Sequence, residues 1–526
     1  MYAATEIDLN DMPYAKGAWF DSEKRCLAGT REDVIQEISN WVNSDGDDVP
    51  RMFLLNGVAG SGKSAISHTV AQRFDELGRL GSFFCFDRAQ QATRGPDIVF
   101  STVARDLADL DPQRKQSLWQ VIQQKRGLRT TRAVRDQFEK FILMPAADLT
   151  AIGPIVIVID ALDESGDQSS RKVLLSVLAE KAADLPSNFR ILLTARAERD
   201  IQKALEGNQN VLCKNMDTMD AKSARHDISL FIDNQLTDIN ADLERTWPNK
   251  SWRQLLTDKS EGLFQWAFTA CEFVKGDGRG GQDPAERLNL LVSSAMQSNK
   301  LNALDQLYRG ILMQTFDTEN ATSMDRFRFI MGRVLLAKEP LSVLALKEVC
   351  YDKDSIESVG LIIRPMGSLL SGTAEGSVPV RPLHTSLRDF LTDRDRSGPF
   401  FIDISPHHHA SFALACLRVM KAGLCFNICK LETSHLRNSD VSDLKTRVEM
   451  AISPHLSYSC RFWADHLRTT TFAPEIADEI RDFLHTRLLF WLEVLSLIKK
   501  VNIATTALLS IIQWSRVRFR VQILMR

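Results

Sequence analysis

Residues 57–64 read G-V-A-G-S-G-K-S, which matches the pattern G-x-x-x-x-G-K-[ST]. An apolar run from Met52 to Leu55 precedes the match, and a helix-forming stretch from Ala65 to Leu77 follows it. In this context the pattern predicts a phosphate-binding loop between a strand and a helix, because its glycines allow successive backbone N–H groups to turn toward one anion. The dipole of the following helix points at the same anion. We therefore expect an α/β P-loop domain that binds a nucleotide.

Two side chains of the loop have chemistry of their own. The Lys63 ammonium is expected to reach the β- and γ-phosphates, and the Ser64 hydroxyl is a ligand for Mg²⁺. The path of the loop needs glycine at Gly57 and Gly62, where the backbone turns tightly. The whole loop is expected to bind the nucleotide, through Gly57, Val58, Ala59, Gly60, Ser61, Gly62, Lys63 and Ser64.

An acidic motif follows further along the chain, where the apolar run Ile155 to Ile159 leads into D-A-L-D-E at 160–164. A continuous apolar run is typical of a strand that is buried on both faces. We therefore expect this strand at the centre of the sheet, next to the strand of the phosphate-binding loop. Asp160 is then placed to hold Mg²⁺ through water, and Asp163 or Glu164 to orient the attacking water. The alternative is that these carboxylates only cap the helix that follows.

A third motif, L-L-T-A-R at 192–196, is another apolar strand with a polar end. Arg196 can reach a γ-phosphate from there, and the alternative is a solvated arginine at a strand end. The base is inferred by elimination, because a guanine site needs N-K-x-D and the nearest match, Asn249 to Trp252, lacks the aspartate. The expected cofactors are ATP or ADP with Mg²⁺, and Ser64 and Asp160 are the expected metal ligands.

Short β-rich runs alternate with longer helical ones between Met52 and Val211. Such alternation predicts a parallel sheet with helices on both faces. The expected strands are Met52–Leu55, Gly81–Phe86, Ile155–Asp160 and Phe189–Thr194. Further on, helical spacing covers 223–236 and 262–274. A polar, Gly-rich stretch from Gly276 to Asp283 then separates these helices from a third region.

The third region is expected to be a winged-helix module, because three helices precede a two-stranded ribbon. The helices are expected at Phe327–Leu336, from Ser342 onward, and at Ile356–Leu370 with a bend at Pro365. The ribbon is expected at Leu369–Thr373 and Val378–Arg381, with a turn at Gly376.

From residue 405 onward the pattern predicts helices alone, with breaks at Pro454 and Pro474. The chain is thus expected to comprise five parts in order. They are an N-terminal segment (1–48), the nucleotide-binding domain (49–215), a helical domain (216–300), the winged-helix domain (301–395) and a C-terminal helical region (396–526).

Composition excludes several classes of function. Lysines and arginines (65) nearly match acidic residues (67), so the net charge of −2 gives no electrostatic reason to expect a nucleic-acid partner. The nine cysteines are scattered, as in a reduced cytoplasmic protein, and Cys425 and Cys429 lack the paired ligands of a zinc site. The most apolar late segment, Leu488 to Trp514, contains charged residues and predicts packed helices instead of a membrane span.

Together these motifs resemble those of the NACHT family of STAND-class nucleotide switches, and specifically the NACHT proteins abundant in fungi. The resemblance implies a nucleotide-binding domain followed by a helical domain, a winged helix and further helices. Five motifs carry it, at 57–64, 160–164, 192–196, 261–267 (E-G-L-F-Q-W-A) and 383–391 (L-H-T-S-L-R-D-F-L).

The resemblance also implies two further site residues. In STAND switches a winged-helix histidine contacts the β-phosphate of ADP and locks the closed state, and His384 matches it; the alternative is a core histidine of the winged helix. The same resemblance puts Arg31 near the adenine. Relatives usually carry an effector module before the core and a repeat sensor after it. This chain shows neither, which leaves a truncated gene or a core that acts through partner proteins.

The implied function is an ATP/ADP-binding signalling switch. ADP holds a compact resting form, exchange for ATP opens it, and slow Mg²⁺-dependent hydrolysis through Asp163, Glu164 and Arg196 resets it. The expected output is nucleotide-dependent self-association and signalling in the cytoplasm with effector or sensor partners, as in the innate-immunity type of non-self recognition or programmed cell death.

Two alternatives come from other classes of protein. One is a P-loop ATPase motor that acts on nucleic acid through the winged helix, although 327–391 shows no strongly basic recognition surface. The other is a scaffold with a degenerate ATPase, against which the intact Lys63, Ser64, Asp160 and Glu164 argue.

Overall fold

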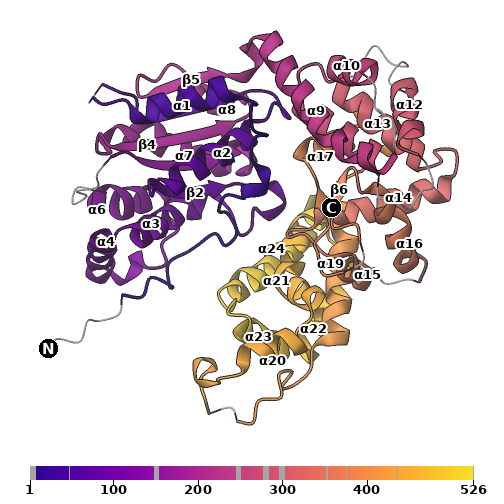
Figure 1. Cartoon of the computed structure of the whole chain (residues 1–526). Coiled ribbons are helices and arrows are strands. Elements are labelled where there is room, and N and C mark those ends of the chain that lie inside the picture. The colour runs from indigo at the N-terminus through magenta and orange to yellow at the C-terminus, as the bar shows by residue number, and fades with distance from the viewer. Residues whose placement is uncertain are drawn as a thin grey trace. The chain divides into compact units, whose positions relative to one another are not determined.

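In the computed structural model the chain forms two compact units (Figure 1). The first comprises Met1–Leu290 with Asn302–Leu304, and the second Leu291–Leu301 with Asp305–Arg526. Residues 277–282, in the polar, Gly-rich stretch from Gly276 to Asp283, lie outside the described residues, and so does Asn249. The structure describes residues 7–46, 48–146, 153–243, 250–276, 283–294, 302–350, 353–374, 376–433 and 435–524.

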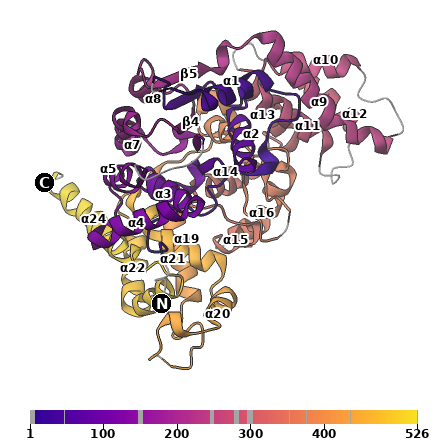
Figure 2. The same ribbon diagram turned by 60° about the vertical axis from the view of Figure 1, so that its left-hand side comes forward.

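A five-stranded parallel sheet forms the centre of the first unit (Figures 1 and 2). Its order is β2-β3-β4-β1-β5. The predicted parallel sheet is therefore confirmed. The strands are β1 (Met52–Asn56), β2 (Leu80–Cys85), β3 (Ile155–Asp160), β4 (Phe189–Ala195) and β5 (Val211–Asn215).

The order of the strands differs from the prediction in two ways. β3 is not central and does not pair with β1, because β4 lies between them and pairs with both. Every residue of β1, β3 and β4 is buried, so an apolar run alone does not reveal which strand is the middle one. β5 was not predicted as a strand. It lies at the edge of the sheet with Leu212 and Cys213 exposed, and therefore lacks the continuous apolar run of a central strand.

Helices cover both faces of the sheet, and alternate residues of each strand point to opposite faces. Phe53 and Leu55 pack with α1 and α2 on one face. Met52 and Leu54 belong to the cluster that α3, α7 and α8 complete on the other face. The helices of this part are α1 (Glu32–Asn43), α2 (Lys63–Glu76), α3 (Val99–Leu110), α4 (Pro112–Gln124), α5 (Val134–Gln137), α6 (Met144–Ala146), α7 (Gln168–Lys181) and α8 (Arg199–Leu205).

Three helices and the first part of a fourth follow the sheet within the first unit, because its boundary at Leu290 falls inside α12. The two segments with helical spacing lie in α9 and α11, so both predictions are confirmed. Phe231 and Phe264 join these two helices with ring centroids 5.8 Å apart. The four are α9 (Ala221–Leu243), α10 (Lys250–Lys259), α11 (Phe264–Lys275) and α12 (Pro284–Ser294).

The second unit begins with helices that precede a short antiparallel strand pair. The pair, β6 with β7, is shorter than the predicted ribbon, because β7 starts only at Arg381. Pro379 lacks an N–H donor, and it forms an isolated bridge with Ser342 instead. The winged-helix identification stays a prediction. The elements are α13 (Ala303–Thr315), α14 (Ala321–Leu336), α15 (Val343–Glu348), α16 (Lys353–Ile363), β6 (Leu370–Ser371), β7 (Arg381–Pro382), α17 (Thr385–Leu391) and α18 (Arg394–Ser397).

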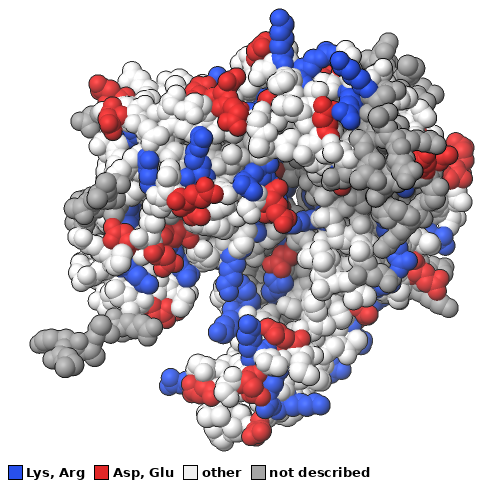
Figure 3. Space-filling view, in the orientation of Figure 1, with Lys and Arg blue, Asp and Glu red and all other residues white. Residues whose placement is uncertain are grey.

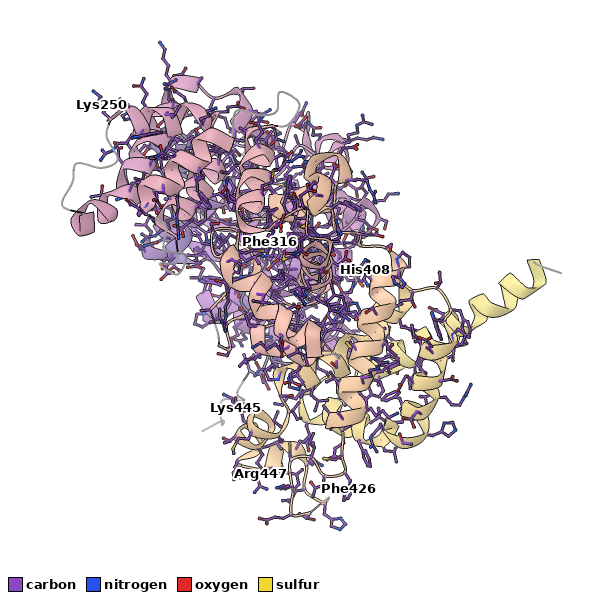
Figure 4. The ribbon with its side chains drawn as sticks, turned by 90° about the vertical axis from the view of Figure 1, so that its right-hand side faces the viewer. Lys250, Phe316, His408, Phe426, Lys445 and Arg447 are labelled. Carbon is purple, nitrogen blue, oxygen red and sulfur yellow. The ribbon has the colours of Figure 1, made fainter. Side chains whose placement is uncertain are left out.

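The C-terminal part of the second unit is mainly helical, but its longest connection, 424–443, contains only one short turn of helix among its described residues. The prediction of helices alone was wrong there. Exposed Phe426 lies in this connection, and it lies with Lys445 and Arg447 at one end of the C-terminal helices (Figure 4). Pro454 and Pro474 each occupy the first turn of a helix, where a missing N–H is harmless. The helices are α19 (Pro406–Gly423), α20 (Leu444–Ala451), α21 (Pro454–Arg468), α22 (Pro474–Thr486), α23 (Leu488–Leu497) and α24 (Ile503–Leu524).

Two general features bear on partners and ligands. Within the described ranges, no helix combines the length and apolarity needed to cross a bilayer. In the same ranges, no three His, Cys, Asp or Glu side chains gather in a way that could hold a metal ion. Basic and acidic side chains are interspersed over the face that Figure 3 shows.

Two buried histidines of the second unit belong to a directed chain of hydrogen bonds. The Lys338 N–H donates to the Tyr458 oxygen (3.0 Å), and the Tyr458 hydroxyl lies 2.8 Å from His466 Nε2. His466 Nδ1 lies 3.2 Å from His409 Nδ1. If Tyr458 donates to Nε2, the neutral His466 ring carries its proton on Nδ1 and donates it to His409. With this direction of donation both rings are neutral, and burial lowers the pKa of His409 to about 4 and that of His466 well below its usual value.

We expect the second unit to lose stability as the pH falls from about 6.5 toward 4. The folded-state pKa of His409 lies below the unfolded one, so its contribution is complete above pH 6.5 and is lost as the unfolded chain takes up protons. A shift of this size corresponds to at most roughly 3 kcal/mol. His409→Gln should remove this part of the pH dependence when denaturant unfolding is followed by tryptophan fluorescence at about pH 7 and about pH 4.5. Exposed His407→Asn is the control, and an unchanged pH dependence in His409→Gln would contradict the assignment.

Candidate nucleotide site

The phosphate-binding loop leaves the carboxyl end of β1 and enters α2. Gly57, Gly60 and Gly62 have φ values of 154°, 83° and 94°, a region that favours glycine. Gly62 is the N-cap residue of α2, and its cap has no side-chain hydrogen bond. The first backbone N–H groups of the helix are therefore not satisfied by a capping side chain, as an anion-binding helix start requires.

Lys63 folds back over the loop. Its Nζ donates to the carbonyl oxygens of Gly57 (2.8 Å) and Val58 (2.9 Å). The residue is 9% exposed, and burial lowers the pKa of the Lys63 ammonium while the charge of Asp163 acts in the opposite direction. These two hydrogen bonds fix the ammonium at the loop, and neither of them involves a carboxylate.

Two residues outside the motif form hydrogen bonds with the backbone of the loop. The Val58 N–H donates to Asp217 Oδ1 (2.9 Å), and the Gln265 N–H donates to the Gly60 carbonyl (3.1 Å). A Cβ on Gly60 would stand 2.6 Å from the Cβ of Gln265. Sequence reasoning noted Gln265 only as part of E-G-L-F-Q-W-A and missed Asp217, which no local pattern marks.

Arg31 also reaches the loop. It is the N-cap residue of α1 with a φ of 60°, and its Nη2 donates to the Ser61 carbonyl (2.9 Å). Its guanidinium lies 4.8 Å from the ring centroid of Phe264, and its backbone N–H donates to Asp227 Oδ2 (3.1 Å). Burial lowers the pKa of Arg31. The structure therefore brings Arg31 to the phosphate-binding loop, while its contact with adenine stays a prediction.

Asp160 ends β3 and is almost completely buried. Its Oδ1 accepts hydrogen bonds from the hydroxyls of Ser67 (2.9 Å) and Thr194 (2.6 Å). Ser67 belongs to α2 and Thr194 to β4, so one carboxylate joins three elements of the site. The Cys85 Sγ lies 3.5 Å from the other oxygen, Oδ2. Of these partners, only Thr194 lies in a motif that the sequence analysis singled out.

The next two acids have different surroundings. Both oxygens of Asp163 contact Arg196: Oδ1 accepts from the Arg196 N–H (3.0 Å), and Oδ2 lies 3.1 Å from Nε. Glu164 is partly exposed, and its Oε2 accepts from the Arg88 N–H (3.1 Å). Burial, and then the charge of Asp163, raise the pKa of Glu164 to about 7. The predicted catalytic residues are therefore neighbours, but they are not equivalent.

His384 belongs to the second unit, whereas the loop residues belong to the first. It is the N-cap residue of α17, and its Nδ1 accepts from the Ser386 N–H (3.2 Å). The neutral ring then carries its proton on Nε2. The Ser386 hydroxyl lies 2.5 Å from the same Nδ1 and 2.8 Å from the Tyr308 hydroxyl. His384 therefore has a capping role within its own unit, and its contact with a β-phosphate stays a prediction.

Three known proteins or families resemble this chain. The family described as Nephrocystin 3, N-terminal, matches residues 29–196. The vegetative incompatibility protein HET-E-1 of Podospora anserina is 23% identical over 529 residues, which cover 91% of this chain but only 36% of that protein. The Walker-type ATPase PABY2304 of Pyrococcus abyssi superposes with a TM-score of 0.33 at 13% identity over 72% of this chain and 97% of that chain, a likeness too loose to support an inference.

The parallel sheet, the glycine-rich loop after β1 and the buried acid at the end of β3 define a P-loop nucleoside-triphosphatase fold. The similarity to HET-E-1 over most of this chain and the family match over residues 29–196 confirm the resemblance to fungal NACHT-domain proteins that the motifs predict.

We expect Gly60→Ala to weaken nucleotide binding by about tenfold or more, because a strained backbone costs of order 1–3 kcal/mol. The added Cβ would collide with Gln265 at a backbone φ of +83°. Gly78→Ala is the matched control, because Gly78 has a φ of +64° but open space around a Cβ. Binding of a fluorescent ADP analogue measures both variants. Equal affinity in Gly60→Ala and Gly78→Ala would contradict the view that Gln265 confines the loop.

Proposed function

We propose that this chain is an ATP- and ADP-binding signalling switch of the NACHT and STAND class. The observation that supports this most is the gathering of charged groups at the carboxyl ends of three neighbouring strands. β1 leads into Lys63, β3 ends at Asp160, and β4 leads into Arg196. Ligands of open α/β sheets bind outside these ends of the strands. These charged groups suit a nucleoside triphosphate, because cations bind its phosphates and a carboxylate holds its metal.

The donor atoms at the proposed metal site suit Mg²⁺. The Ser64 hydroxyl and the Asp160 carboxylate are hard oxygen ligands, and Mg²⁺ binds proteins through few such groups while it keeps several waters. Bound Mg²⁺ neutralises charge on the β- and γ-phosphate oxygens. Asp160 is well suited to this role, because Ser67 and Thr194 fix one of its two oxygens.

The γ-phosphate is the group that distinguishes the two states of the switch. It offers charge-assisted contacts to Arg196 that ADP lacks, and such contacts are about twice as strong as neutral hydrogen bonds. A ligand shifts a two-state equilibrium only by its differential affinity for the two states. In the proposed resting state ADP is bound and His384, on a winged-helix domain, contacts its β-phosphate. Arg31 lies near the base.

The output of the switch is proposed from the relative. HET-E-1 is named a vegetative incompatibility protein, which supports a role in non-self recognition or programmed cell death for this chain. We propose that ATP promotes self-association in the cytoplasm and that effector or sensor proteins are the partners. Slow hydrolysis that involves Asp163, Glu164 and Arg196 returns the protein to the ADP state.

Protein purified without added nucleotide is expected to release close to stoichiometric ADP on denaturation. Chromatography of the released nucleotide measures its identity and its molar ratio to protein. Lys63→Ala should abolish the bound ADP, because the ammonium supplies the only side-chain charge within the glycine-rich loop. Exposed Lys203→Ala is the control on the same unit. His384→Ala should reduce the amount of bound ADP if the histidine locks the resting state.

Other outcomes of the same experiment identify the rival functions. An empty site with rapid ATP turnover that DNA stimulates would indicate a motor on nucleic acid. An empty site without turnover would indicate a scaffold. Full ADP occupancy in Lys63→Ala would contradict the assignment of the nucleotide site itself.

A further inference from the structure

His384 is joined by hydrogen bonds to two buried hydroxyl groups of its own unit. The Ser386 hydroxyl lies 2.5 Å from His384 Nδ1, and it also lies 2.8 Å from the Tyr308 hydroxyl. Tyr308 and Ser386 are both buried. Tyr308 lies 78 positions before Ser386 in the sequence, so no local pattern connects it with the motif at 383–391.

The backbone N–H of Ser386 sets the direction of these hydrogen bonds. It donates to His384 Nδ1 (3.2 Å), so this ring nitrogen presents a lone pair instead of a proton. The Ser386 hydroxyl therefore donates its single proton to Nδ1, and its oxygen accepts the proton of Tyr308. Burial raises the pKa of Tyr308, so the phenol keeps the proton that it donates. This arrangement leaves the ring proton of neutral His384 on Nε2.

Helix α13 fixes the position of the Tyr308 hydroxyl. The Tyr308 ring packs against Phe390 of α17, with ring centroids 5.6 Å apart. Three residues earlier in α13, Asp305 accepts two hydrogen bonds from Arg396 of α18, one from Nε (2.8 Å) and one from Nη2 (2.7 Å). Residues three apart lie on the same side of a helix. One side of α13 therefore contacts both α17 and α18.

The boundary between the two units falls inside α13. Residues 302–304 belong to the first unit, and the second unit continues from Asp305 onward. Tyr308 follows this boundary by about one turn of the same helix. A rotation or shift of α13 therefore moves the Tyr308 hydroxyl directly. The hydrogen bond between Tyr308 and Ser386 links that movement to the His384 ring.

The position of the ring proton decides what the histidine can bind. An Nε2–H group is a hydrogen-bond donor and suits a phosphate oxygen, whereas an unprotonated Nε2 presents a lone pair that repels it. A donor that is already oriented also binds more tightly, because no orientation has to be fixed when the ligand arrives. Tyr308 and Ser386 thus prepare the His384 ring to donate to an anion.

We propose that Tyr308 is a positioning residue. Through Ser386 it holds His384 in the tautomer and orientation that donate to the β-phosphate of ADP, and it thereby couples α13 to the retention of ADP. The inference rests on the proposed function, in which His384 contacts ADP, and it adds a residue that controls this contact. A movement of α13 that separates Tyr308 from Ser386 then weakens the hold on ADP without any change in the phosphate-binding loop.

Nitrogen NMR of the full chain with ¹⁵N-labelled histidine rings tests the positioning role. At about pH 8, where histidines are largely neutral, wild-type His384 should show a protonated Nε2 and an unprotonated Nδ1; loss of these signals in His384→Gln assigns them. Tyr308→Phe and Ser386→Ala should each give a mixture of the two tautomers. A wild-type ring protonated on Nδ1, or an unchanged tautomer in Tyr308→Phe, would overturn the proposal.

Tyr458→Phe is the matched control for both experiments. It also removes a buried hydroxyl from the second unit, but the Tyr458 hydroxyl contacts the His466 ring. It should leave the signals of His384 unchanged. A change of the His384 tautomer in Tyr458→Phe equal to that in Tyr308→Phe would mean that any lost hydroxyl disturbs the ring, and would count against the proposal.

The release rate of a fluorescent ADP analogue, measured after addition of excess ADP, tests the consequence for the nucleotide. Tyr308→Phe should speed release by about three- to tenfold, as expected for the loss of one hydrogen bond. Tyr458→Phe should release at the wild-type rate. In the His384→Gln background, Tyr308→Phe should add nothing to the effect of His384→Gln alone. Two effects that multiply would show that Tyr308 acts without His384, against the proposal.

The His384→Gln variant separates failure of this inference from failure of the switch. A wild-type protein that binds no ADP, or a His384→Gln variant that retains ADP as long as the wild type, overturns the proposed resting state itself. Fast release from His384→Gln with wild-type release from Tyr308→Phe overturns only the inference. A thermal unfolding midpoint close to that of the wild type shows that a variant is folded, and Ser386→Ala provides the same test if Tyr308→Phe does not fold.

Discussion

The buried carboxylate of Asp160 is the constraint on which the geometry of the site depends. A buried charge without hydrogen-bond partners costs several kcal/mol, so Asp160 needs donors from the elements around it. Ser67 from α2 and Thr194 from β4 supply them. Because these donors flank the acid, the helix of the phosphate-binding loop and the strand that leads to Arg196 keep a fixed register relative to β3. The strand order makes this possible, since β4 pairs with both β1 and β3.

The sequence predicted the site best where the chemistry depends on consecutive residues. The loop at 57–64 and the acids at 160–164 could be predicted, because a glycine path and a strand with an acidic end are local patterns. The order of the strands could not, because several strands are equally buried and apolar. Asp217 and Gln265 could not be found for a related reason. Their contacts with the loop involve residues more than 150 positions away, such as Val58 with Asp217, and no local pattern marks such pairs.

In the second unit, prolines indicated the boundaries of helices but not whether a helix ends or begins there. Pro454 and Pro474 were expected as breaks, and they are the starts of two helices. A proline is compatible both with the end of one element and with the start of the next, so the pattern predicted these boundaries. It did not predict the irregular connection at 424–443. His384 illustrates a limit of motif reasoning. The motif led to a residue at the start of a helix, while its hydrogen bond to Ser386 depends on the local backbone that only a structure reveals.

The bond between the Gly60 carbonyl and the first turn of α11 has an evolutionary consequence. The loop and α11 lie about two hundred positions apart in the sequence, yet the Cβ of Gln265 stands where a side chain at position 60 would have to go. Neither segment can therefore drift independently of the other. Among related sequences the two should covary: a change in the backbone path of the loop is tolerated only together with a change at the start of α11. The start of α11 is therefore expected to be conserved together with the loop.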